Sequence, residues 1–265
     1  MVRELKRIGK ILGQLYLLVC AVLWGIQGHF IFEPYTSQRP SPPYSTIEYE
    51  LVVDEAKGIK SRGYIVNPSA PGPVILFFAG RNEDAVSYAD ALERLDVPAV
   101  LPNYRGHGQS DGRPTERTTL ADAKLTLQMV RERYPDRPIV LLGDSLGTAV
   151  AIRITDPDIA GMILVSPFRS LAHVASRNLL RIVPLRFIMR HKFDTRSKLD
   201  ELPDKVLVIY SETDEIIRAK ETERVLEQIP QAEVVVDEAD HFFVFMRNLR
   251  AMQQWLLENF EDIES

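Results

Sequence analysis

The stretch IVLLGDSLGTAVAIRI (residues 139–154) decides the fold of this chain. Its first four residues form an apolar run typical of a buried strand, and the residues from Leu146 onward have a helical pattern. Gly143 and Gly147 flank the sequence Asp-Ser-Leu, and they permit a tight strand-to-helix turn that lifts the Ser145 hydroxyl above the sheet. The same turn places Ser145 at the positive end of the helix dipole, where a developing oxyanion is stabilised. The pattern therefore predicts that Ser145 is a nucleophile.

Apolar runs and helical patterns alternate on both sides of this stretch. Apolar runs are expected where both faces of a sheet are covered, and alternation with helices indicates a mostly parallel sheet. We therefore expect an α/β fold with helices on both faces of the sheet. The charged residues 54–61 predict a hairpin turn between the first two strands. Strands are expected at 46–53, 62–66, 74–78, 99–101, 139–142, 162–165, 206–210 and 234–236, and helices at 84–95, 119–134, 146–154, 219–227 and 243–260.

A serine hydroxyl needs a general base, and His241 is the residue expected to supply it. It is the only histidine after His191, and it follows the strand expected at 234–236. Active sites of open α/β sheets lie at the carboxyl ends of strands, which favours this position. The histidines that precede the acid loop outside the N-terminal segment are interpreted as surface or cap residues: His107, His173 and His191.

Asp214 is the acid expected to orient this histidine. It lies in the loop after the strand at 206–210, so the chain order is serine, acid, histidine. Its carboxylate would accept the Nδ1 proton of His241 and hold Nε2 toward Ser145. The rival carboxylates are Glu212, Glu215, Asp237 and Asp240. Glu212 and Glu215 are expected to point to solvent, and Asp240 is adjacent to His241 and cannot easily reach around to its ring.

Two backbone N–H groups are expected to form an oxyanion hole. One belongs to Leu146, the residue after the nucleophile. The other lies in the loop AGRN (residues 79–82), where Arg81 is the first choice and Asn82 the second. The glycine-rich segment 103–112 lacks the spacing of a phosphate loop, and no metal-ligand spacing occurs, so we expect neither a cofactor nor a metal.

The first 32 residues predict a membrane anchor. Residues 11–32 contain no Asp, Glu, Lys or Arg, and as a helix they would span roughly 33 Å, about the thickness of a bilayer core. Basic residues precede the span at positions 3, 6, 7 and 10, which favours a cytoplasmic N-terminus and a domain on the periplasmic or extracytoplasmic side. A cleaved signal peptide and a lipoprotein signal ending at Cys20 are the alternatives.

Three further segments complete the expected organisation. Residues 33–45, rich in Pro and Ser, are predicted to be an extended linker before a single large α/β domain at 46–265. Residues 167–202 break the alternation of strands and helices and are both basic and amphipathic. We interpret them as either a small cap over a pocket, in contact with lipid headgroups, or a solvated crossover with a basic face.

Composition excludes some classes of protein. The net charge of −5 argues against a nucleic-acid partner, because phosphate recognition needs a basic surface. The single cysteine, Cys20, cannot form an intrachain disulfide and makes a structural zinc site improbable. The 45% hydrophobic and 26% charged content is ordinary for a folded globular domain.

The motifs AGRNED, NYRGHGQSDG, GDSLG, SPFRSL, VIYSETDEIIR and DHFF occur in this order. Together they resemble the α/β-hydrolase superfamily over roughly residues 45–258. With the N-terminal segment, the chain looks most like the membrane-anchored α/β-hydrolase-domain proteins described as serine aminopeptidase-like or lysophospholipase-like. The resemblance implies a serine hydrolase with nucleophile Ser145, acid Asp214 and base His241, and with oxyanion donors at the amides of Arg81 and Leu146.

Two positions depart from the family pattern. The family often has His-Gly before the oxyanion residue, where this chain has Ala79-Gly80, and it often has Pro where this chain has Arg218. The first departure puts the conformation of the oxyanion loop in doubt, although backbone donors do not depend on the side chain. We expect hydrolysis of carboxylic esters or thioesters of small-molecule or lipid substrates through an acyl-enzyme. The alternatives are an aminopeptidase-like peptidase and an inactive membrane-tethered scaffold that binds a partner.

Overall fold

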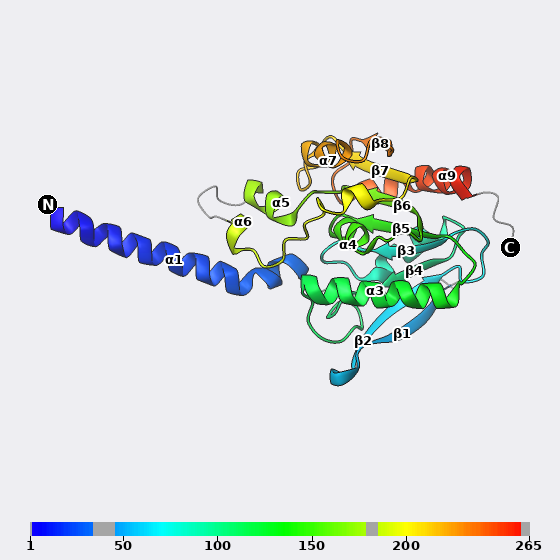
Figure 1. Cartoon of the computed structure of the whole chain (residues 1–265), viewed down its shortest axis with the longest axis horizontal. Coiled ribbons are helices and arrows are strands. Elements are labelled where there is room, and N and C mark those ends of the chain that lie inside the picture. The colour runs from blue at the N-terminus through cyan, green and yellow to red at the C-terminus, as the bar shows by residue number, and fades with distance from the viewer. Residues whose placement is uncertain (1, 34–45, 179–184, 261–265) are drawn as a thin grey trace.

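The computed structural model describes residues 2–33, 46–178 and 185–260 of the chain (Figure 1). The expected linker lies outside these residues except for Glu33, and so does the part of the expected cap at 179–184.

A sheet of eight strands forms the centre of the described domain (Figure 1). The strand order is β1-β2-β4-β3-β5-β6-β7-β8, with β1–β2 and β2–β4 antiparallel and every other pair parallel. The parallel strands β3 to β7 are apolar and almost fully buried because helices cover both faces. The bounds are β1 Thr46–Asp54, β2 Ile59–Val66, β3 Val74–Phe78, β4 Ala99–Pro102, β5 Ile139–Asp144, β6 Ile159–Val165, β7 Val206–Ser211 and β8 Glu233–Asp237.

Two hydrophobic cores lie on opposite faces of this sheet. Alternate residues of β3 point to opposite sides, so Leu76 belongs to one core and Phe77 to the other. The first core contains residues of α3 (Glu116–Arg133), α4 (Leu146–Ile154) and α7 (Ala219–Leu226). The second contains residues of α2 (Ala89–Glu93), α8 (Val244–Arg247) and α9 (Leu249–Phe260). The expected fold class, a mostly parallel sheet between helices, is confirmed.

Local differences from the expected elements have identifiable causes. The hairpin turn is shorter than residues 54–61, because Glu55–Lys57 forms one 3₁₀ turn that ends at Gly58 in the left-handed region (φ 62°), so β2 begins at Ile59. The helix expected at 84–95 is a 3₁₀ turn, Ala85–Tyr88, followed by the short α2. The helix expected at 243–260 is broken at Asn248, whose side-chain amide donates hydrogen bonds to Asp237 and to the Val244 carbonyl.

The N-terminal helix α1, Val2–Phe32, extends away from the domain, with its C-terminal end against it (Figure 1). Among the described helices, it is the one long and apolar enough to cross a bilayer, with a mean hydropathy of 1.8 over its most apolar window. Residues 167–202 connect β6 to β7 and include α5 (Leu171–Asn178), α6 (Leu185–Ile188) and a 3₁₀ turn, Leu199–Glu201. Helix α6 lies against α1 (Figure 1).

Candidate active site

Ser145 occupies a strained turn between β5 and α4. Its backbone has φ 50° and ψ −113°, a conformation that costs free energy in a non-glycine residue and persists only where the surroundings enforce it. The turn packs directly against the end of β3, because a Cβ on Gly147 would lie 1.9 Å from the Phe78 carbonyl oxygen. A hydrogen bond from the Ser145 N–H to the Val165 carbonyl (2.9 Å) ties the turn to β6. The motif glycines are therefore required by the close approach of backbone segments.

The structure brings Ser145, His241 and Asp214 into one hydrogen-bonded chain. His241 Nε2 lies 3.0 Å from Ser145 Oγ, and His241 Nδ1 lies 2.6 Å from Asp214 Oδ2. Ser145 follows β5, Asp214 follows β7 and His241 follows β8. These strands run parallel within the order β5-β6-β7-β8, so their carboxyl ends lie at the same edge of the sheet. With Nδ1–H donating to the carboxylate, Nε2 is left to accept the serine proton.

Asp214 is held rigidly by hydrogen bonds. It is only 4% exposed. Its Oδ1 accepts from the backbone N–H groups of Ile216 (2.8 Å) and Ile217 (2.7 Å), and the hydroxyl of Ser166 donates to Oδ2 (3.1 Å). Together these donors fix the carboxylate that faces His241. The rival carboxylates lie elsewhere: Glu212, Glu215 and Asp240 are exposed, and Asp237 pairs with Asn248 and Arg247.

Arg81 and Leu146, whose backbone N–H groups are the expected oxyanion donors, line the same pocket as Ser145. Within the described part of the chain, neither group donates a hydrogen bond to a protein acceptor. The Arg81 carbonyl is held by Nε2 of His107 at 2.9 Å, and its guanidinium donates to the Phe30 carbonyl at 3.0 Å. Arg81 is therefore fixed from the domain on one side and from α1 on the other.

His107 contacts the loop that contains Arg81, which the sequence did not indicate. We expected a surface or cap residue, and this was wrong: its side chain is 0% exposed, in the loop after β4. The ring lies between the Arg81 and Arg105 carbonyls, at 2.9 Å and 3.2 Å. A neutral imidazole donates one hydrogen bond, and the shorter contact assigns it to Arg81. The motif RGHGQSDG contained this histidine, but no spacing rule connects it with the oxyanion loop.

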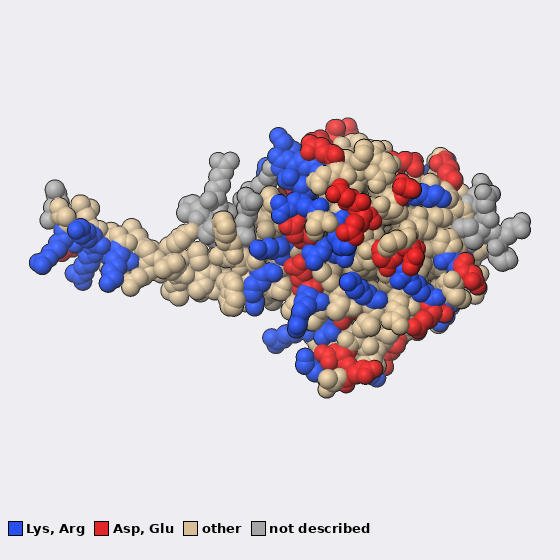
Figure 2. Space-filling model, in the orientation of Figure 1, with Lys and Arg blue, Asp and Glu red and all other residues tan. Residues whose placement is uncertain are grey.

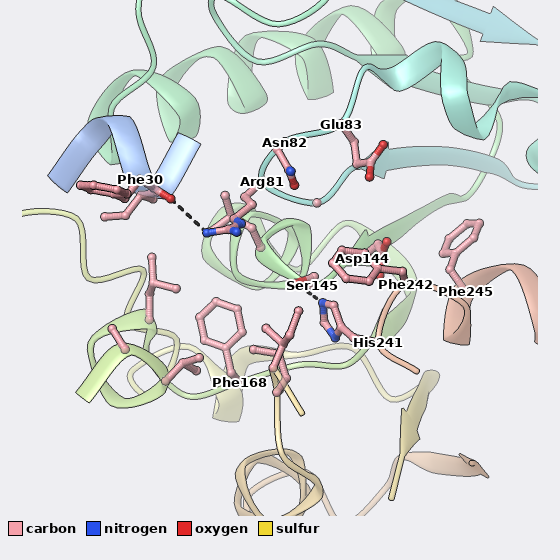
Figure 3. A pocket seen from close by; sticks show the side chains of 18 of the residues that line it. Phe30, Arg81, Asn82, Glu83, Asp144, Ser145, Phe168, His241, Phe242 and Phe245 are labelled. Carbon is pink, nitrogen blue, oxygen red and sulfur yellow. Dashed lines mark hydrogen bonds between the residues drawn. The ribbon is translucent and has the colours of Figure 1, made fainter. Parts of the chain in front are cut away.

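Two further carboxyl groups, of Glu83 and Asp144, line the pocket beside Ser145 (Figure 3). The Tyr88 hydroxyl donates to Asp144 Oδ2 at 2.7 Å. Burial raises the pKa of Asp144, although the Tyr88 hydrogen bond and the charge of His241 oppose the shift. Burial also raises the pKa of Glu83, and the neighbouring charge of Asp144 adds to this effect. A cationic group beside this pair would relieve the repulsion between the two carboxylates.

The pocket above Ser145 has a volume of about 450 Å³ and two chemically different ends. In Figure 3, Phe30 and Phe168 lie to one side of Ser145, and Glu83 and Phe245 lie to the other. The first end is lined by apolar residues of α1, α5 and the segment after α6: Ile31, Leu171, Val174, Ala175 and Met189. Within the described residues, no group of three or more His, Cys, Asp or Glu side chains is arranged to hold a metal ion.

The fold and this site define the class of protein: the chain is an α/β hydrolase. Residues 69–201 match the family model described as serine aminopeptidase, S33, and the chain belongs to that family. The chain is 29% identical over 236 residues to an uncharacterized protein of Mycobacterium tuberculosis, and the match covers 84% of this chain and 83% of that protein. It is 25% identical over 193 residues to the lysophosphatidylserine lipase ABHD12 of Danio rerio, and this match covers 62% of this chain and 49% of the lipase. Among solved structures, an esterase of Pyrococcus furiosus has the same fold, with a TM-score of 0.68 at 16% identity. The superposition covers 85% of this chain and 98% of the esterase.

Proposed function

We propose that this protein is a membrane-anchored serine hydrolase that cleaves ester or thioester bonds of amphipathic acyl substrates. The observation that carries the proposal is the hydrogen-bonded chain from Ser145 through His241 to Asp214, which lies at the base of an open pocket. A serine hydroxyl becomes a useful nucleophile when a correctly oriented base accepts its proton.

Acylation follows from the placement of these groups. Ser145 Oγ attacks the substrate carbonyl carbon while its proton passes to His241 Nε2, over a starting distance of 3.0 Å. The negative charge that develops on the carbonyl oxygen is stabilised by the N–H groups of Arg81 and Leu146. The intermediate collapses as His241 donates that proton to the leaving alcohol or thiol, which departs and leaves an acyl ester on Ser145.

Deacylation repeats the same steps with water. His241 accepts a proton from water, the hydroxide equivalent attacks the acyl ester, and the histidine returns the proton to Ser145 Oγ as the carboxylic acid departs. Asp214 accepts the Nδ1 proton throughout, so the imidazole keeps the tautomer that faces the serine. Neither half-reaction needs a cofactor.

The apolar end of the pocket and the anchor support an acyl lipid or a related amphiphile as substrate. The relatives include lysophosphatidylserine lipases, which agrees with this substrate class. Helix α1 would cross the bilayer once. The basic residues at its start favour a cytoplasmic N-terminus, which places the hydrolase domain on the opposite side.

Labelling with a fluorophosphonate tests the nucleophile. We expect the full-length protein in detergent to be labelled, the Ser145→Ala variant to lose all labelling, and the Ser197→Ala variant to be labelled like the wild type. Ser197 is an exposed serine that does not line the pocket. Labelling of Ser145→Ala at the wild-type rate would refute the assignment. A folded wild type that is never labelled would favour the scaffold interpretation.

A second candidate activity is removal of an N-terminal amino acid from a peptide. The observation that favours it is the pair Glu83 and Asp144, which could neutralise a substrate ammonium group beside Ser145. Aminoacyl p-nitroanilides and p-nitrophenyl esters of fatty acids distinguish the two activities. A kcat/KM for aminoacyl anilides above that for the esters, lost in Glu83→Gln, would favour the peptidase.

A further inference from the structure

The C-terminal end of α1 is built into the hydrolase domain. Phe32 is 0% exposed, and its ring meets that of Phe193 edge-on, with the centroids 5.9 Å apart. Gln27 is 8% exposed; its amide nitrogen donates to the Ile188 carbonyl (3.3 Å), and its amide oxygen accepts from the Arg190 N–H (2.6 Å). Burying both ends of an amide side chain is costly unless both are hydrogen-bonded, so these contacts fix the position of the helix.

Helix α1 also forms an apolar cluster with the segment that contains α5 and α6. The cluster consists of Cys20, Leu23 and Ile31 from α1 together with Leu171, Ala172, Ala175, Ile188 and Met189. Four of its members also line the pocket above Ser145: Ile31, Leu171, Ala175 and Met189. Phe30, which is adjacent to Ile31, lines the pocket as well. The residues that join α1 to the segment with α5 and α6 therefore also form one wall of the pocket.

The length of the charge-free part of α1 places this wall at the membrane surface. Residues 11–32 carry no charged side chain and span roughly 33 Å as a helix, whereas a hydrocarbon core is about 30 Å thick. The basic residues at positions 3, 6, 7 and 10 lie before this part, so Phe30 and Ile31 lie at its opposite end, on the side of the domain. The domain contacts the same end of α1 through Arg190, whose guanidinium stacks on the Trp24 ring at 4.5 Å.

Basic side chains lie on the domain beside this end of α1. Figure 2 shows Lys and Arg side chains gathered on the part of the domain nearest α1. A groove beside the helix is lined by four cationic side chains and one carboxylate: Arg117, Lys124, Arg153, Arg190 and Glu116. Arginine and lysine side chains hold phosphate groups through charge-assisted hydrogen bonds, so this surface suits the phosphates of lipid headgroups and supports a position of the pocket mouth close to the membrane.

We infer that Phe30 and Ile31 are specificity-determining residues, which contact the acyl chain of a membrane lipid as it passes from the bilayer along α1 into the pocket. The inference rests on the proposed serine-hydrolase function and adds the anchor helix to the substrate site. The acyl chain occupies the end of the pocket between α1 and α5, and the ester carbonyl lies over Ser145. The leaving group then faces the end with Glu83 and Asp144.

Chain-length profiles of enlarged variants test this inference. With p-nitrophenyl esters from C2 to C16, Ile31→Trp narrows the apolar end, so we expect the ratio of kcat/KM for C12 to that for C2 to fall at least tenfold. The matched control is Leu17→Trp, the same enlargement on α1 at a side chain that is 67% exposed and distant from the pocket. We expect its ratio to stay within twofold of the wild type.

A second variant guards against misfolding of the first. Phe30 is largely exposed, so Phe30→Gln should fold normally, and we expect its C12 to C2 ratio to fall several-fold because the acyl path becomes polar. An unchanged ratio in both pocket variants, or an equal fall in Leu17→Trp, would overturn the inference. Failure of the proposed function looks different, because the wild type would then hydrolyse no ester and resist fluorophosphonate.

Discussion

Replacement of Gly147 by alanine should damage the proposed oxyanion hole and the fold together. A Cβ at this position would lie 1.9 Å from the Phe78 carbonyl oxygen, 2.5 Å from its carbonyl carbon and 2.9 Å from the Ala79 carbonyl oxygen. All three are backbone atoms, so no side-chain rotation relieves the clash. The two segments that must move each carry one of the proposed oxyanion donors: Leu146 is next to Gly147, and Arg81 follows shortly after Ala79.

The size of the effect follows from these distances. The nearest contact is about 1.5 Å short of an ordinary van der Waals separation of 3.4 Å. Register pairing between Phe78 of β3 and Gly143 of β5 ties the two segments together, so the shift cannot be confined to one of them. Overpacking that moves backbone costs about 1–3 kcal/mol of folding stability, and we expect the upper part of that range. A misplacement of about 1 Å at a reacting centre lowers the rate about 100-fold.

Steady-state kinetics and chemical unfolding of the purified variant measure both effects. We expect kcat/KM for p-nitrophenyl butyrate to fall at least 100-fold. Gly161→Ala is the matched control, because its Cβ would approach only the ring ends of Phe260 (3.0 Å) and Trp255 (3.1 Å), which can shift. It should keep activity within threefold. A Gly147→Ala enzyme with wild-type stability and activity within threefold would refute the reasoning.

Three further predictions concern side chains around the site. Asp214→Asn should lower kcat about 10⁴-fold with little change in KM, because the amide favours the wrong tautomer of His241; a loss below tenfold would contradict this role. His107→Ala should lower kcat about 10- to 100-fold, less than complete loss of an oxyanion donor, and His107→Gln should restore part of the rate if the hydrogen bond to Arg81 matters. His191 accepts a hydrogen bond from a backbone N–H, and burial, with the charge of Arg190, lowers its pKa below the ordinary 6.5. The unfolded state therefore binds this proton more readily than the folded state does. As a result, the contribution of neutral His191 to the free energy of unfolding is complete above about pH 6.5. It falls as the pH decreases, by at most about 1.4 kcal/mol per pH unit. Urea unfolding at pH 7 and pH 5 should show this loss in the wild type and a smaller one in His191→Gln.

The sequence predicted the parts of the structure that depend on local pattern. The buried strands and the turn at Ser145 are encoded by contiguous apolar runs and by glycines at fixed positions, so their bounds agree with expectation within a few residues. The helix expected at 243–260 was predicted as continuous because its apolar pattern continues through Asn248. The break depends on a hydrogen bond to Asp237, a residue of β8, which no local pattern records.

Features formed by distant segments were not predictable in the same way. The sequence indicated α1 as a membrane anchor, but its contribution of Phe30 and Ile31 to the pocket depends on contacts with Arg81 and with residues of α5 and of the segment after α6, which are distant in the sequence. The contact between His107 and the Arg81 carbonyl likewise joins two loops that follow different strands. Placement of His241 and Asp214 was predictable because strand order alone brings the carboxyl ends of β7 and β8 together.

Trapping of the acyl-enzyme tests the central proposal most directly. The full-length protein would be mixed with excess p-nitrophenyl ester, quenched in acid within the first turnovers and digested for peptide mass spectrometry. We predict a burst of nitrophenol and an acyl group on the peptide that contains Ser145, with both absent in Ser145→Ala. Turnover by a folded enzyme with no acyl adduct on that peptide, or with the adduct on another residue, would contradict the account.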